Sequence, residues 1–251
     1  MSLVGQAATL VAFPVGAAVV GSTVATWKRP GPRLVSGVQH FAAGVVIAAL
    51  VGEVLPDLRN EGNLTWAVGG FIAGVVVMLS LGAFERRQEA RQAAQNSSGP
   101  AHAAAYTLPI SLLVVVGIDL LLDGLLVGLG VTLGSSAGLI ITIALTIEIL
   151  FLALSVVGEL LDEGVPRARA ALICILLGLI TAVGAIGGAA VLGGATPQVL
   201  AAVLAFGSVA LLYLAVEELL VEAHEQQEST LLGAMFFAGF LLIYILGEVA
   251  A

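Results

Sequence analysis

Charged side chains are scarce in this sequence. Asp, Glu, Lys and Arg make up only 10% of the 251 residues, whereas hydrophobic residues make up 59% and the mean hydropathy is +1.10. A soluble domain usually carries about 25% charged residues. The composition therefore excludes an ordinary soluble domain and predicts a protein that crosses a membrane several times.

Cysteine and basic residues are also few. Cys174 is the single cysteine, so an intrachain disulfide and a thiolate metal cluster are both excluded. Nine Lys and Arg against seventeen Asp and Glu give a net charge of −8, and we expect no nucleic-acid partner. The N-terminus lacks the basic segment and cleavage site of a signal peptide, so we expect the first membrane helix to begin at Leu3.

What the chain does contain is a series of apolar runs. A transmembrane helix needs about 20 mostly apolar residues. We therefore expect an all-α membrane protein with eight transmembrane helices, forming a single transmembrane domain over residues 1–251, and a mobile cytoplasmic loop at 85–105. The predicted helices cover residues 3–26, 34–55, 64–84, 106–134, 137–161, 168–192, 197–220 and 230–249.

The basic residues predict how the chain is oriented. With the eight predicted helices, only Arg59 falls on one side of the membrane. By the positive-inside rule the other loops are cytoplasmic, and both termini are extracellular in a multi-pass protein of the cell membrane. The residues on the predicted cytoplasmic side are Lys28, Arg29, Arg33, Arg86, Arg87, Arg91, Arg167 and Arg169.

Three acidic residues lie deep in apolar runs. An ionisable residue there costs about 2.5–3.5 kcal/mol on insertion scales, so it is a functional candidate by default. Asp119 and Asp123 are four residues apart and share one helix face. The fourth and fifth predicted helices turn near residues 135–136, and Asp123 and Glu148 are equidistant from that turn. Both should lie about 17–19 Å from it, near the bilayer centre.

Three carboxylates at one depth would repel one another unless they are neutralised. Either protons neutralise them, or a cation binds between them, and carboxylate oxygens suit divalent cations. The structural alternative is that each acid is protonated and hydrogen-bonded to a neighbouring helix. We expect Asp119, Asp123 and Glu148 to form a metal site.

Further acidic residues are predicted at the two mouths of the bundle. They could attract cations and pass them along, although ordinary capping explains any one of them equally well. His40 begins the second predicted helix and is expected to be structural. The predicted entry and exit path comprises Glu53, Asp57, Glu159, Glu217, Glu218, Glu222 and His224.

Several segments resemble the ZIP (Zrt/Irt-like) family of divalent metal transporters. "FAAGVVIAALVGEVLPDL" is similar to the family's second helix, and "LLYLAVEELLVEAHE" to its seventh. "DGLLVGLG" resembles the end of the fourth-helix motif H-N-x-x-[DE]-G. The resemblance covers the whole chain and implies the ZIP bundle, in which the fourth and fifth helices are central and carry the metal centre.

The departures from the family pattern are specific. The resemblance places Asp119 and Glu148 at motif histidines, so one metal position keeps three oxygen ligands. Leu120 and Ile149 replace distinctive ligands of a second position. Both motif prolines are absent, so the two central helices should be straighter than in the family.

We therefore expect a divalent cation transporter with a single central carboxylate site, moving metal towards the cytoplasm. Mn²⁺, Fe²⁺, Zn²⁺ and Cd²⁺ are the candidate substrates, and no cofactor is expected. The alternative is a ZIP-fold sensor or partner subunit that does not transport. A proton-coupled carrier ranks third. Lipids are the expected surroundings, and a homodimer is left open. "GSSAG" at 134–138 matches a hydrolase pattern, but no histidine partner is near, so we expect no enzyme.

Overall fold

The computed structural model describes residues 1–27, 31–96, 108–224 and 229–250. Eight helical spans in this part of the chain are long and apolar enough to cross a membrane, and the described residues contain no strand. The prediction of an all-α protein with eight membrane helices is confirmed. The elements are α1 (Leu3–Leu10), α2 (Ala12–Trp27), α3 (Pro32–Ala49), η1 (Leu50–Val54), α4 (Leu55–Glu61), α5 (Leu64–Asn96), α6 (Ile110–Leu133), α7 (Ser135–Asp162), α8 (Arg167–Leu192), α9 (Pro197–Tyr213), η2 (Leu214–Leu219), α10 (Leu220–Ala223) and α11 (Thr230–Ala250).

Helix α5 is longer than expected. We predicted a loop from residue 85, but α5 continues to Asn96, so that prediction was wrong for residues 85–96. This stretch is rich in Glu, Arg, Gln and Ala, which are strong helix formers, and it contains neither Gly nor Pro. Polarity ends the membrane-spanning part of the helix without ending the helix itself. The rest of the predicted loop lies outside the described residues.

Three of the spans are interrupted. The first is divided at Val11, because Pro14 has no N–H to donate to the carbonyl of Leu10. In the second, the π-helical segment η1 leads into Pro56, and the Leu55 N–H donates to Leu50 O. The seventh span contains a second π-helical segment, η2. Helices α6 and α7, which contain no proline, run without interruption.

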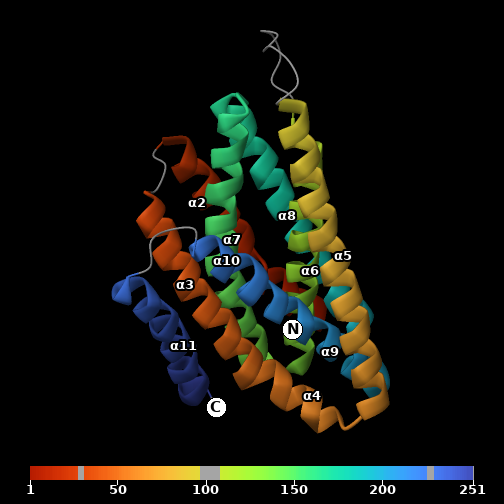
Figure 1. The fold of residues 1–251 in the computed structure, drawn as a ribbon. Helices are drawn as coiled ribbons and strands as arrows, with labels where there is room; N and C mark the ends of the chain where they lie inside the picture. The colour runs from red at the N-terminus through yellow and green to blue at the C-terminus, as the bar shows by residue number, and fades with distance from the viewer. Residues whose placement is uncertain (28–30, 97–107, 225–228, 251) are drawn as a thin grey trace.

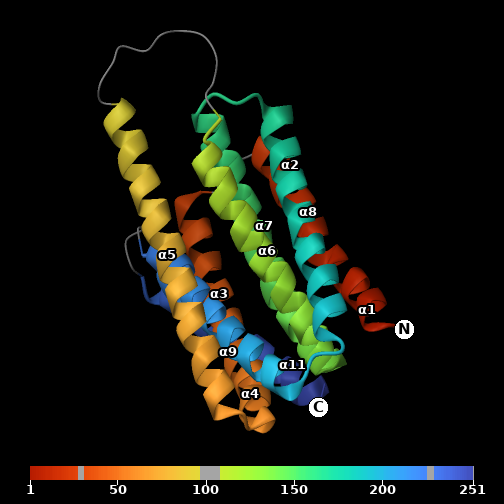
Figure 2. The same ribbon diagram turned by 90° about the vertical axis from the view of Figure 1, so that its right-hand side faces the viewer.

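Helices α6 and α7 run side by side through the middle of the bundle in both views (Figures 1 and 2). Only Gly134 separates them, and its φ of 150° is a conformation that favours glycine. We call the end of the bundle at this junction the Gly134 end, and the opposite end, where α7 stops, the Asp162 end. Both termini lie towards the Gly134 end (Figure 2).

The other helices pack around this pair. Helix α8 lies along α6, α2 along α7, α11 along α3 and α5 along α9. The α6–α8 contact is close because glycines face each other: a Cβ atom on Gly124 would lie 2.1 Å from Thr181 O, and one on Gly184 would lie 2.3 Å from Leu121 O. Small residues at such a contact let helix backbones approach in lipid. This contact fixes the position of Asp123, the residue before Gly124.

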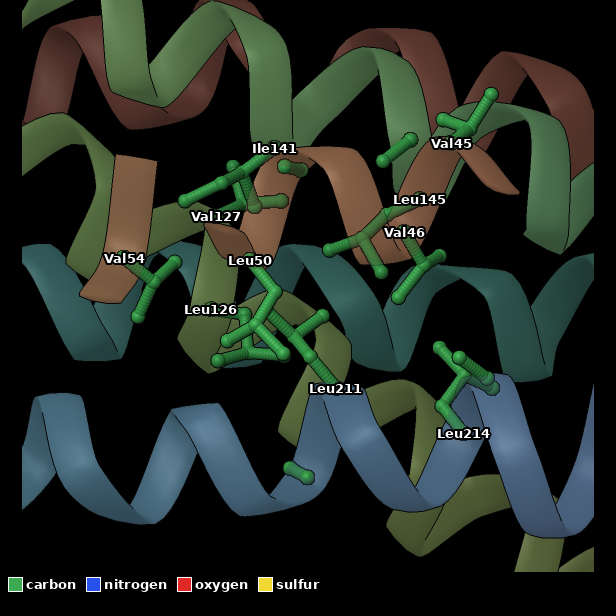
Figure 3. Close-up of a cluster of buried hydrophobic side chains, with 14 of the residues drawn as sticks. Val45, Val46, Leu50, Val54, Leu126, Val127, Ile141, Leu145, Leu211 and Leu214 are labelled. Atoms are coloured by element: carbon green, nitrogen blue, oxygen red, sulfur yellow. The ribbon is translucent and has the colours of Figure 1, made fainter. Parts of the chain in front are cut away.

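A buried apolar cluster fills the bundle between α3, η1, α6, α7, α9 and η2 (Figure 3). Leu145 is fully buried, and Leu50 and Leu211 are each 1% exposed, so these side chains pack closely in this layer. On α7, Leu145 lies one turn from Glu148 towards the Gly134 end, and Ile141 one turn further. The cluster therefore separates the deep acids from the Gly134 end.

Candidate metal centre

The three deep acids converge. Asp119, Asp123 and Glu148 each offer a carboxylate oxygen, and these oxygens all lie within 4.8 Å of one another. Asp119 and Asp123 come from consecutive turns of α6, and Glu148 comes from α7 at the matching depth. The convergence expected from the symmetry of the hairpin is therefore present in the structure.

Burial makes this cluster unusual. Asp123 is 3% exposed and Glu148 2%, whereas Asp119 is partly accessible. Asp123 Oδ2 and Glu148 Oε2 are buried and have no hydrogen-bond partner. An unsatisfied buried oxygen costs free energy comparable to a lost hydrogen bond, and more if it is charged. A bound cation would satisfy both oxygens, because hard divalent ions take oxygen ligands.

The position beside this cluster is apolar. Leu120 and Ile149 are 3% and 1% exposed, and both belong to a buried cluster that also contains Ala18, Ala153 and Cys174. The cavity between these side chains is only about 10 Å³, the lower limit for a single water molecule, and its lining side chains are apolar apart from the Cys174 thiol. The side chains of Leu120 and Ile149 offer no ligand atom to a second ion.

A comparison with models of known protein families shows which family this chain belongs to. Residues 83–247 match the model of the ZIP zinc transporter family, which is more than half of the chain. This chain belongs to the ZIP family. The ZIP family consists of metal transporters, so this ZIP chain is a multi-pass membrane protein whose metal ion is a transported substrate and not a resident cofactor. A search among curated proteins found no match.

One side of the centre opens towards the Asp162 end of the ZIP bundle. A small cavity of about 50 Å³ begins at Glu148 and continues between α7, α3 and the seventh span. Glu218 of η2 and Glu222 of α10 line it, so two acids of the predicted path face the same space as the central site. The other lining residues are Val35, Gln39, Phe151, Leu152, Ser155, Leu214 and Leu219.

The remaining acids of the predicted inner path lie elsewhere. Glu159 and Glu217 are exposed. The α7 residues that line the cavity end at Ser155, one turn before Glu159. Glu217 precedes the lining residue Glu218 in η2, where the wider π-helical turn changes the direction of successive side chains. His224 is also exposed and lies beside His40.

A larger cavity, of about 720 Å³, lies at the Gly134 end between α3, η1, α7 and α11. Half-buried Glu53 lines it together with Ser136 and Glu248. Asp57 lies one turn after Glu53, is also half-buried and is not among the residues lining this cavity. Glu53 is thus the predicted entry residue that reaches this space, while Asp57 lies beyond it on α4.

Sequence reasoning missed two polar residues of α3, Ser36 and Gln39. Ser36 Oγ donates to Ala223 O at 2.7 Å, and Gln39 Nε2 donates to Glu222 Oε2. His40, which we expected to be structural, is 5% exposed and lies against His224. The spacing of Ser36 and His40, one turn apart on an apolar helix, marks a polar face, but the sequence does not indicate which helix packs on it.

Proposed function

We propose that this protein moves a divalent metal cation through a single central site formed by Asp119, Asp123 and Glu148. The observation that supports this most strongly is the set of three carboxylates within 4.8 Å, with two buried oxygens that lack a partner, in the middle of a ZIP bundle. Three acids without a cation would need several protons to avoid repulsion. A cation accounts for the cluster with no further assumption.

The donor set favours oxygen-loving metals. All three proposed ligands are carboxylates, which suit Mn²⁺ and Mg²⁺-like ions. Zn²⁺ and Fe²⁺ are the ions that imidazole ligands suit. Carboxylates also bind Zn²⁺, so Zn²⁺, Cd²⁺ and Fe²⁺ stay among the candidate substrates. The apolar side chains of Leu120 and Ile149 are the reason for proposing one ion at the centre and not two.

The route follows from the two cavities. We propose that cations gather at Glu53 in the cavity at the Gly134 end, which faces the outside together with both termini. They pass to the central site, and leave past Glu218 and Glu222 towards the cytoplasm. In this proposal the buried layer that contains Leu145 and Leu50 closes the outer route, and the cavity that begins at Glu148 leads to the inner side; the burial of these residues and the lining of that cavity support it.

Transport and binding by charge-removing variants test the proposal. Asp123→Asn and Glu148→Gln keep the shape of the side chains but remove a charge where electrostatic interactions are strong. Each should weaken Mn²⁺ binding at least tenfold and abolish uptake of Mn²⁺, Fe²⁺, Zn²⁺ and Cd²⁺ into proteoliposomes. The control is Glu163→Gln, which removes a charge at the exposed end of α7 and should transport normally.

Two results would contradict this function. Equal uptake by the wild type and by Asp123→Asn would remove the central site from the mechanism. Metal binding by the wild type without uptake of any of the four ions would instead indicate a sensor or partner subunit with a ZIP fold.

A further inference from the structure

The cavity at the Gly134 end is larger than the entry of a metal ion requires. Its volume is about 720 Å³, and residues of α3, η1, α7 and α11 line it. A divalent ion with six bound waters needs about 180 Å³, at about 30 Å³ for each water. Sites for small organic molecules usually measure about 300–1,000 Å³. The size of this cavity therefore matches an organic ligand better than a single ion.

The lining of the cavity is apolar and acidic. Phe240 and Tyr244 contribute aromatic rings, and Glu53 and Glu248 contribute carboxylates. Apart from Ser136, the other lining residues are glycine, alanine, valine and isoleucine, and none of the described lining residues is basic. The carboxylates disfavour an anion, whereas the apolar walls favour a ligand with an apolar body.

The two carboxylates come from different spans but face the same space. A Cβ atom on Gly247 of α11 would lie 3.7 Å from Glu53 Oε1, so the Glu53 carboxylate of η1 reaches the backbone of α11. Glu248 is the next residue of α11 and lines the same cavity. A positive group in this part of the cavity is therefore attracted by both carboxylates.

We propose that this cavity binds a lipophilic organic cation, such as a quaternary ammonium compound, with its charged group near Glu53 and Glu248 and its apolar body against Phe240 and Ile243. A bulky organic cation spreads its charge and holds water weakly, so it enters an apolar space at a lower cost than a divalent metal ion does. The aromatic rings add cation–π attraction for a quaternary ammonium group.

Occupancy of this site should interfere with metal entry. The inference rests on the proposed function in this respect alone, because Glu53 is the residue at which we propose that metal cations gather. An organic cation held beside Glu53 would compete with them. The cavity would then be an inhibitory site, separate from the three central carboxylates.

The first test measures binding of tritiated benzyltriethylammonium to the full-length protein in phosphatidylcholine nanodiscs by equilibrium dialysis, with empty nanodiscs as the background. The wild type should bind one molecule per chain. Gly52→Leu should weaken binding at least tenfold, because Gly52 lines the cavity and its Cβ would have no heavy atom within 4 Å, so a leucine fills space without a clash. Glu248→Gln should weaken binding at least threefold, since it removes one of the two charges.

Gly233→Leu is the matched control. Gly233 also lies on a lipid-spanning helix, α11, and its Cβ would also be in open space, but it does not line the cavity. Its binding of the probe should equal that of the wild type. Equal binding by the wild type and Gly52→Leu would place the probe elsewhere and overturn the proposal. Equal binding of the neutral analogue, in which carbon replaces the ammonium nitrogen, would also overturn it, because the carboxylates would then take no part.

The second test separates this inference from the proposed function. Asp123→Asn changes the central site and not the cavity, so it should bind the probe like the wild type. Mn²⁺ uptake by the wild type without probe binding would overturn this inference and leave the proposed function intact, and probe binding without Mn²⁺ uptake would do the reverse. Where both are present, benzyltriethylammonium on both sides of the proteoliposome membrane should inhibit Mn²⁺ uptake by the wild type. Gly52→Leu should keep its own uninhibited rate, and equal fractional inhibition of the two proteins would contradict an inhibitory role for this cavity.

Discussion

The central acids are costly residues with few compensating interactions inside the protein. Asp123 and Glu148 are almost completely buried, and each keeps an oxygen without a hydrogen-bond partner. Protons and metal ions therefore compete for the same oxygens. This competition links metal binding to pH at the level of single residues.

Metal binding at the central site should weaken as pH falls. Protonation removes the charge that binds the cation, so Mn²⁺ affinity should drop at least tenfold between pH 7.5 and pH 5.5. Calorimetry in two buffers with different ionisation enthalpies would also count the protons that Mn²⁺ releases. In Glu148→Gln one titrating ligand is absent, so the residual binding should release fewer protons. A Mn²⁺ affinity that is independent of pH would contradict a carboxylate site.

A polar side chain in place of Leu120, beside the central site, should destabilise the protein without creating a second metal site. Leu120→Asn buries an amide next to Ile149 in a space without polar partners, at a cost of about 1–3 kcal/mol. Thermal unfolding in detergent would show a lower Tm, and the metal count per chain should stay the same. Leu120→Met, which roughly conserves volume, should change the Tm much less. A second bound Mn²⁺ in Leu120→Asn would contradict this prediction, because it would show that a second metal site lacked only a ligand atom at residue 120.

The convergence of Asp123 and Glu148 could be predicted from the sequence because it depends only on helix geometry. Asp123 and Glu148 are equidistant from one tight turn, so equal rise brings them to equal depth. The contacts of Ser36, Gln39 and His40 depend on how α3 packs against α10, and nothing in the sequence pattern fixes that packing. Glu159 and Glu217 were expected on the path because they lie at one mouth of the predicted bundle, but their surroundings depend on neighbouring helices and on the π-helical turn of η2.

At the scale of helices, the glycine contact between α6 and α8 sets the geometry of the centre. The backbone of Gly124 lies so close to Thr181 that even a methyl group would overlap its carbonyl oxygen. Since Asp123 precedes Gly124, a shift of α6 away from α8 moves Asp123 relative to Glu148. The close approach was not predictable, because G-x-x-x-G pairs are common by chance in a chain with 31 glycines.

Gly124→Ala should therefore separate α6 from α8. The overlap should cost about 1–3 kcal/mol, as in other overpacked sites, and should weaken Mn²⁺ binding although no ligand is changed. Gly117→Ala is the matched control on the same helix, because its Cβ would lie 3.5 Å from Ile180 Cδ1, an ordinary contact. Thermal unfolding and Mn²⁺ titration of both variants check this. Equal behaviour of the two variants would mean that the α6–α8 contact does not position the site.

At the scale of the whole molecule, the two ends of the bundle differ in charge and in access. Arg167 and Arg169 begin α8 at the Asp162 end, and Arg33 begins α3 there, whereas Arg59 lies on α4 at the Gly134 end. Lys28 and Arg29 lie outside the described residues. The cavity of about 50 Å³ extends from Glu148 towards the more basic end. The proposed direction of transport therefore depends on that end facing the cytoplasm.

Labelling from the two sides of the membrane tests this orientation. Glu163 and Asn60 are exposed at the Asp162 end and the Gly134 end respectively, so cysteines there form a matched pair. A membrane-impermeant maleimide added to intact cells should label Asn60→Cys and not Glu163→Cys, and inverted membrane vesicles should give the reverse. Cys174 is 5% exposed and should stay unlabelled in both, so the wild type is the background control. The opposite pattern would place both termini and the Glu53 cavity in the cytoplasm. The same route from Glu53 past Asp123 to Glu222 would then carry metal out of the cell, and the proposed direction would be wrong while the site itself would stand.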